Sequence, residues 1–295
     1  MDGFYSRKWT ISIILAGYFF LASNIAVEKW LLETYSLYEI NFITAATFMI
    51  ITAIQEFFTK GSIHSIRPFS WKILLLISIF TLGAWHFFLT ALKGLSVFEF
   101  GSMALLSPVI TSALAKFFLK ERPSFYIFPA IILGFIGGFF MMDAQWKGFG
   151  SAQYHLFMLV ALFFSSLRWI LVKHVGDNIP TSALIFWEPS LVLISMGFII
   201  DLSSLWQKIS LVLFSSAVLL VLSRQLLVRS YQNRSTTATN ISSLIYTKLV
   251  WTFLFGYWFW DNIPKPIELI GVLLIILSSM FVIIPSLKLS KSIKN

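Results

Sequence analysis

The sequence predicts an all-α integral membrane protein whose ten transmembrane helices form two inverted repeats of five. Of its 295 residues, 58% are hydrophobic and 12% are charged, whereas soluble domains are about 45–50% apolar and about 25% charged. The apolar stretches are long and do not alternate, which favours helices over the ~10-residue strands of a membrane barrel. The two halves also match each other, and five crossings in the first half force the second to enter from the opposite face.

Windows of about 20 residues identify the ten spans, and the connections between them are too short to hold a soluble domain. The first repeat contributes the spans 9–27, 38–58, 71–90, 97–119 and 124–142. The second repeat contributes the spans 153–173, 181–201, 209–229, 237–259 and 264–286.

The basic residues set the orientation of these spans. With the N-terminus in the cytoplasm, thirteen of the 22 Lys and Arg residues fall in inside segments, five in outside segments and the other four within spans. Cytoplasmic loops carry the excess of Lys and Arg in membrane proteins, so both termini are predicted to be cytoplasmic. The formal net charge of +9 does not indicate nucleic-acid binding, because the basic residues are scattered among short loops.

The two halves of the chain share several features at similar spacing. Phe19 matches Phe163 at an offset of 144 residues, and the fourth and ninth spans each end in an acidic turn that leads to a proline. These features predict a duplication, with the first five-helix repeat at 1–145 and the second, inverted repeat at 146–295.

Three motifs resemble those of a known family. They are Asn24 with Lys29 at the end of the first span, Ser107-Pro108 with Phe117-Phe118-Leu119-Lys120-Glu121 in the fourth, and Gly134-Phe135-Ile136-Gly137 in the fifth. In these motifs the chain resembles the drug/metabolite transporter superfamily, specifically its EamA-like ten-span group. The ninth span departs from the pattern, since Thr247 stands where the fourth span has Pro108.

The resemblance implies a fold and a class of function. Spans 1–4 and 6–9 would surround a central cavity, and spans 5 and 10 would pack at the periphery. Relatives transport amino acids, S-adenosylmethionine, nucleotide sugars or other small metabolites.

Charges within spans are the strongest functional evidence, because each costs at least ~2.5–3.5 kcal/mol at the bilayer centre. Lys248, near the middle of the ninth span, either contacts an anionic substrate group or completes a structural ion pair. Glu188 lies ~10 Å into the seventh span and either binds a cationic group or a proton, or pairs with Arg168 or Arg224. Arg168, near the cytoplasmic end of the sixth span, either faces the substrate path or extends to the interface.

Three further residues are candidate substrate contacts. Asn24 is the repeat mate of Arg168, and inverted symmetry places the two at opposite ends of one path. Tyr246, close to Lys248 in the sequence, can present its ring to a substrate cation or ring. His86, in the third span, either titrates near neutral pH or is hydrogen-bonded within the bundle.

Other polar and small residues have structural explanations. Arg224, near the inner end of the eighth span, is expected to anchor that helix at the interface, and Lys116 and Glu99 are expected to be structural charges. Gly134 and Gly138 allow close helix approach, either within the bundle or at a homodimer interface.

The sequence contains no recognisable motif for hydrolysis, nucleotide binding or zinc binding, and it contains no cysteine. We therefore predict no enzyme activity and no cofactor. The leading hypothesis is a secondary transporter of a small polar metabolite, an amino-acid-like or S-adenosylmethionine-like zwitterion, in a bacterial inner membrane. Alternating access would be driven by protons or by counter-substrate. The alternatives are an enzyme or flippase acting on lipid-linked substrates and a non-transporting scaffold.

Overall fold

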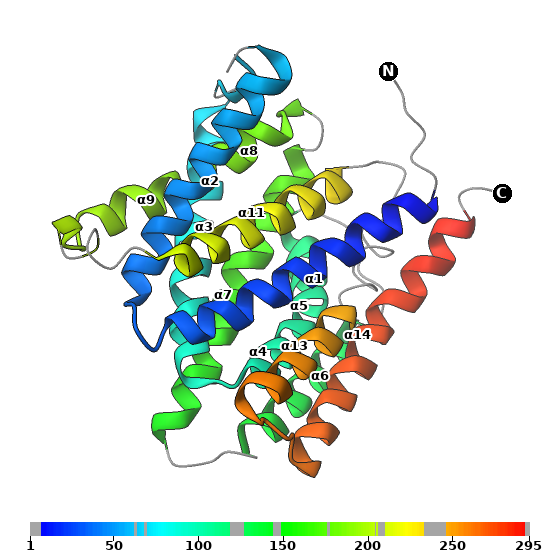
Figure 1. Ribbon diagram of the computed structural model, residues 1–295. Coiled ribbons are helices and arrows are strands. Elements are labelled where there is room, and N and C mark those ends of the chain that lie inside the picture. The colour runs from blue at the N-terminus through cyan, green and yellow to red at the C-terminus, as the bar shows by residue number, and fades with distance from the viewer. Residues whose placement is uncertain are drawn as a thin grey trace.

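The computed structural model describes residues 7–61, 64–67, 70–118, 127–143, 149–175, 178–203, 205, 210–232 and 246–292. Within these ranges every regular element is a helix (Figure 1). The first half contains α1 (Arg7–Leu31), α2 (Leu37–Lys60), η1 (His64–Ile66), α3 (Trp71–Gly94), α4 (Val97–Met103), η2 (Ala104–Leu106), α5 (Ser107–Phe118) and α6 (Ile127–Asp143). The second half contains α7 (Phe149–Val175), α8 (Thr181–Trp187), α9 (Ser190–Gly197), α11 (Leu211–Gln232), α13 (Tyr246–Trp260) and α14 (Pro266–Ser292).

Five of these helices are long and apolar enough to cross a membrane. The qualifying segments are Ser12–Leu31, Leu37–Thr59, Trp71–Gly94, Ala152–Val175 and Leu211–Val228. Shorter apolar helices cover Val97–Thr111, Thr181–Gly197 and Pro266–Ser278. The helices fall on the predicted spans, and the all-helical prediction is confirmed; the first part of the ninth span, 237–245, lies outside the described residues.

The starts of α2 and α4 are fixed by the same local motif. The Glu39 N–H donates to Ser36 Oγ, and the Glu39 carboxylate accepts from the Ser36 N–H at 2.8 Å. Ser96 and Glu99 repeat this capping box, again with a 2.8 Å hydrogen bond from the Ser96 N–H to the carboxylate. Each box pairs backbone donors that the first turn of a helix leaves free, so Glu99 has the structural role expected of it.

Prolines interrupt the helices of two predicted spans. Pro108 has no N–H to donate to the carbonyl of Ala104, and the 3₁₀ helix η2 separates α4 from α5 immediately before it. Pro189 separates α8 from α9 and adopts φ −89° and ψ 4°. This second break leaves Glu188 as the residue that caps the C-terminus of α8 inside the protein, where it is 2% exposed.

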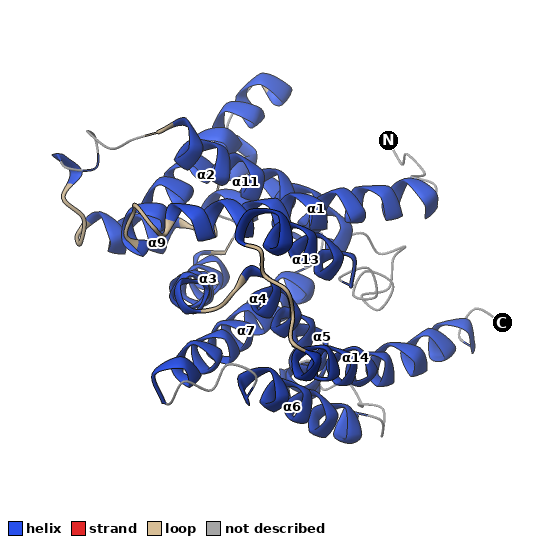
Figure 2. Cartoon of the chain, turned by 60° about the horizontal axis from the view of Figure 1, so that its bottom comes forward, coloured by secondary structure: helices blue, strands red, loops and turns tan. Residues whose placement is uncertain are grey.

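Helices of the first half pack mainly against helices of the second half. α1 lies along α11, α3 lies along α7, and α6 lies along α14. In both views α6 and α14 form a pair at one side of the bundle, away from α2 (Figures 1 and 2). The start of α1 and the end of α14 lie on the same side of the molecule.

The glycines of α6 are used for packing within the chain. A Cβ atom on Gly137 would lie 2.7 Å from the Gly271 carbonyl oxygen, and one on Gly134 would lie 2.9 Å from Ser278 Oγ. The spacing of Gly134 and Gly138 is therefore explained by contact with α14 and η2 and gives no support to a homodimer. Another side of α6 exposes large apolar side chains, as a lipid-facing surface does: Ile132, Phe135 and Phe139.

Candidate functional site

A cavity lies between the two halves of the chain. The space open to the centres of water molecules is about 140 Å³, whereas one water needs roughly 10–15 Å³ on the same measure. Its described wall comes from α1, α2, α3, α4, η2, α5, α7, α11 and α13, and not from α6 or α14. This agrees with the resemblance, which places the fifth and tenth spans at the periphery. The cavity is large enough for a small metabolite.

One end of the cavity is basic and is built around Trp169 in α7. The guanidinium carbon Cζ of Arg168 lies 4.5 Å from the ring centroid of Trp169, and that of Arg224 lies 5.3 Å from the same centroid. Arg168 donates from Nη1 to Glu188 Oε1, and Arg224 Nη2 lies 3.7 Å from the same oxygen. Both arginines and Trp169 line the cavity. Two guanidinium groups thus share one carboxylate, and the described cluster has a net positive charge.

The contacts in this cluster bear on the roles predicted for Arg168, Glu188 and Arg224. Arg168 is 1% exposed, so it points into the protein and does not extend to the membrane interface. Glu188 pairs with both arginines, which agrees with the second of the two roles considered for it, pairing with Arg168 or Arg224. The interfacial role expected for Arg224 is wrong: its side chain is 11% exposed and lines the cavity, because contacts with Glu188 and Trp169 stabilise its charge inside the bundle.

Lys248 lies at the cavity wall in α13. Its side chain is 5% exposed, and its ammonium group forms no ion pair with any carboxylate in the part of the chain that the structure describes. A buried charge without a partner is costly. The structural ion pair considered for Lys248 is therefore not found among these residues, and an anionic or polarisable substrate group can supply the missing partner.

Asn24 links the two halves beside the cavity. Its Nδ2 donates to the Ser216 carbonyl oxygen at 3.1 Å and to Ser216 Oγ at 3.0 Å. The contact joins α1 to α11, and Asn24 is 1% exposed while lining the cavity. Its amide is thus held in a fixed orientation.

Three buried polar atoms of uncharged lining residues have no hydrogen-bond partner among the residues that the structure describes. They belong to residues on α2 and α11 and are Asn41 Nδ2, Thr44 Oγ1 and Ser223 Oγ. Buried polar atoms are nearly always paired in proteins. Groups of a bound solute or water molecules are the partners that this cavity can offer them.

Glu28 lines the cavity and is not among the predicted site residues, because it lies one residue beyond the predicted first span, 9–27. A signal was present in the spacing. Asn24 and Glu28 are four residues apart and therefore lie on one face of a helix. If Asn24 faces the cavity, Glu28 follows it one turn further along.

The described structure does not bring His86 to the cavity. His86 is half-buried, and its ring lies 6.1 Å from that of Tyr38 and 5.4 Å from that of Phe87. Tyr246 is the first residue of α13, and its side chain lies outside the described part of the structure.

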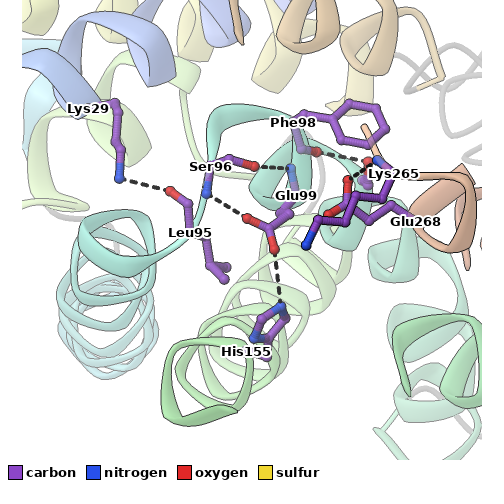
Figure 3. Close-up of polar contacts among 9 residues, drawn as sticks. Lys29, Leu95, Ser96, Phe98, Glu99, His155, Lys265 and Glu268 are labelled. Atoms are coloured by element: carbon purple, nitrogen blue, oxygen red, sulfur yellow. Dashed lines mark hydrogen bonds and ion pairs between the residues drawn. The ribbon is translucent and has the colours of Figure 1, made fainter. Parts of the chain in front are cut away.

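Lys29 belongs to a set of helix-end contacts and not to the cavity wall (Figure 3). Its Nζ donates to the carbonyl oxygens of Leu92, Lys93 and Leu95 at 2.8, 3.2 and 2.9 Å. These carbonyls end α3 without partners of their own. In the same view Glu99 lies between Ser96 and His155, whose Nε2 is 3.6 Å from the carboxylate.

The chain is similar to known transporters over most of its length. The model of the EamA-like transporter family matches residues 8–142 and 153–284. An S-adenosylmethionine uptake transporter of Rickettsia bellii (strain RML369-C) is 24% identical over 244 residues, which is 80% of this chain and 79% of that protein. A solved crystal structure superposes with a TM-score of 0.66 at 14% identity, covering 94% of this chain and 98% of its own. That last likeness concerns the fold.

Proposed function

This chain belongs to the EamA-like transporter family, and from that premise we propose that it moves a small amphoteric metabolite through the cavity by alternating access. The chain is a membrane transporter and not an enzyme, as the family and the transporter relative indicate. Its proposed location is a bacterial inner membrane, which is supported by the bacterial origin of that relative.

The proposed architecture is ten spans in two inverted repeats, 1–145 and 146–295, with both termini in the cytoplasm. Helix packing supports it. When each helix is exchanged with its counterpart in the other repeat, the contact of α1 with α11 becomes that of α7 with α3, and both contacts occur. The contact of α1 with α13 likewise becomes that of α7 with α4 and α5, and these contacts also occur.

The observation that carries the substrate proposal is Lys248, which has no ion-pair partner among the described residues and lines a cavity that also contains a carboxylate. Lys248 and the arginine cluster favour an anionic group, and Glu28 favours a cationic one. Groups that are costly to bury alone are stabilised when a solute supplies the opposite charges. An amino-acid-like or S-adenosylmethionine-like zwitterion has both signs of charge, and the substrate of the Rickettsia relative is of this class.

Transport would follow from rocking of the two repeats about the shared cavity. Each repeat contributes charged or polar groups to the wall, including Glu28 and Asn24 from the first and Arg168 and Lys248 from the second. A substrate that contacts both sets favours closure around itself. The free energy for accumulation would come from a proton gradient or from exchange with counter-substrate.

The test is uptake by purified protein in proteoliposomes. Labelled amino acids, S-adenosylmethionine, nucleotides and sugar phosphates would each be offered with and without a proton gradient, and with and without internal counter-substrate. We expect accumulation of an amphoteric solute that depends on one of these two driving forces. Flux confined to uncharged or purely anionic solutes would contradict the proposed substrate class, and accumulation that neither condition changes would contradict the proposed coupling.

A further inference from the structure

The Glu28 carboxylate has no counter-charge in the described structure. Among the described lining residues it is the only carboxylate, and no described Lys or Arg forms an ion pair with it. The neighbouring Lys29 is committed elsewhere, because its ammonium group donates to three carbonyl oxygens at the end of α3. A carboxylate in a largely buried position favours a cationic partner.

The basic end of the cavity is too far away to provide that partner. Trp169, which contacts both arginines, packs against the cluster that contains Ile14 and Tyr18 on α1. Tyr18 and Glu28 both line the cavity and are ten residues apart on the same helix, which corresponds to ~15 Å at 1.5 Å per residue. Glu28 and the arginine cluster are therefore separated along the cavity, and Lys248, which also lines it, forms no ion pair with any described carboxylate.

Two polar residues in the N-terminal part of α2 line the same cavity as Glu28. α1 ends at Leu31 and α2 begins at Leu37, so Glu28 and Asn41 are each about one turn from the connection between the two helices. Asn41 and Thr44 are three residues apart, hence on one helix face, and they line the same cavity while being 3% and 2% exposed. Asn41 Nδ2 and Thr44 Oγ1 have no hydrogen-bond partner within the described ranges of the chain.

We propose that Glu28, Thr44 and Asn41 form the binding site for the primary ammonium group of the substrate. The Glu28 carboxylate and Thr44 Oγ1 accept hydrogen bonds from the ammonium group, and Asn41 Nδ2 donates to an oxygen of the same head group. The remainder of the substrate extends toward Trp169 and the basic end. A solute that contacts both ends of the cavity is therefore elongated, and residues of the first repeat bind its ammonium group. This inference rests on the proposed function and specifies its substrate.

The test is the selectivity of binding for the ammonium group. The probes are S-adenosylmethionine, methionine and arginine, each paired with its analogue in which hydrogen replaces the α-ammonium group, and binding is measured on protein in nanodiscs. In Glu28→Gln we expect the affinity for the preferred ammonium-bearing probe to fall about tenfold or more, as for loss of a hydrogen bond to a charged group. The affinity for its deaminated analogue should stay unchanged.

Two further variants separate recognition from folding. Thr44→Val keeps the shape of the side chain and removes the hydroxyl, and it should lower the affinity for the same probe, about threefold to tenfold, with the analogue again unaffected. Glu33→Gln removes an exposed carboxylate in the turn after α1 and should bind like the wild type. Thermal melting of each variant establishes that it is folded.

The possible results distinguish the two proposals. Equal loss for a probe and its analogue in Glu28→Gln would assign Glu28 a structural role and overturn the inference alone, as would unchanged affinity for both. A wild-type protein that transports other solutes but binds no ammonium-bearing probe would overturn both the inference and the amphoteric substrate class.

Discussion

Arg168 in α7 and Glu188 at the end of α8 form an ion pair that is almost completely removed from solvent, with side chains 1% and 2% exposed. Arg224 of α11 approaches the same carboxylate at 3.7 Å. The break at Pro189 leaves Glu188 at a helix end where one carboxylate meets side chains from two other helices. Three helices of the second half of the chain are thus joined by one shared carboxylate.

The first prediction concerns the asymmetry of this pair. Glu188→Gln leaves two guanidinium groups without the carboxylate, whereas Arg168→Gln leaves Glu188 beside Arg224. Removing one partner of a buried ion pair costs about 3–5 kcal/mol, so both variants should melt at lower temperature in detergent, and Glu188→Gln should melt at the lowest. The double variant should lose less stability than the two single losses together. A double variant whose loss of stability equals the sum of the two single losses would contradict the coupling, as would a Glu188→Gln variant that is more stable than Arg168→Gln.

The second prediction concerns Lys248. Lys248→Met removes a buried ammonium group that has no ion-pair partner among the described residues, so the melting temperature should stay the same or rise. Flux of the transported solute should fall at least about tenfold, since a charge contact with the substrate is lost. Lys72→Met is the matched control, because Lys72 is exposed at the start of α3. Unchanged flux in Lys248→Met would remove Lys248 from the substrate path.

The third prediction separates Lys29 from the substrate site. Lys29→Met leaves the carbonyl oxygens at the end of α3 without their ammonium donor, which should lower the free energy of unfolding by about 1–3 kcal/mol. The ratio of KM values for two transported solutes should not change, because Lys29 does not line the cavity. Lys93→Met alters an exposed side chain at the same helix end and should have little effect. A changed solute preference in Lys29→Met would contradict this assignment.

The fourth prediction uses two adjacent glycines of α6. Gly137→Ala places a Cβ atom 2.7 Å from the Gly271 carbonyl oxygen, so α6 and α14 must move apart. In Gly138→Ala the new atom would meet only Leu106 Cδ1, at 3.9 Å. Thermal melting should show a loss of about 1–3 kcal/mol for the first variant and no loss for the second, whose alanine also favours the helix. Equal effects would mean that α6 and α14 pack differently.

Spans and cavity differ in how far the sequence predicts them. Hydropathy is local, so the helices α1, α2, α3, α7 and α11 were located by windows of one span length. The wall of the cavity depends on how each helix is rotated, which windows do not report. The charges within spans, Arg168, Glu188 and Lys248, are identified by the sequence because burial of a charge is costly anywhere in a span.

Residues near span ends were harder to assign. Arg224 has the spacing of an interfacial anchor, and only the packing of α11 against α1 and α2 places it beside Trp169. Glu28 lies one residue beyond the predicted end of the first span, so the cost of a charge within a span does not identify it. Thr44 and Asn41 are uncharged, so only the packing of the described helices shows that Thr44 Oγ1 and Asn41 Nδ2 have no hydrogen-bond partner among the described residues.

The last prediction tests the orientation of the chain in the membrane. The sequence contains no cysteine, so a maleimide can label only the cysteine that is introduced. Lys72 and Lys93 lie near opposite ends of α3, and both side chains are exposed. With cytoplasmic termini, the third span runs outward, so Lys93→Cys should react with a membrane-impermeant maleimide in intact cells. Lys72→Cys should react only after permeabilisation, because its thiol faces the cytoplasm. The opposite pattern would invert the protein in the membrane and place the Glu28 end of the cavity on the inside.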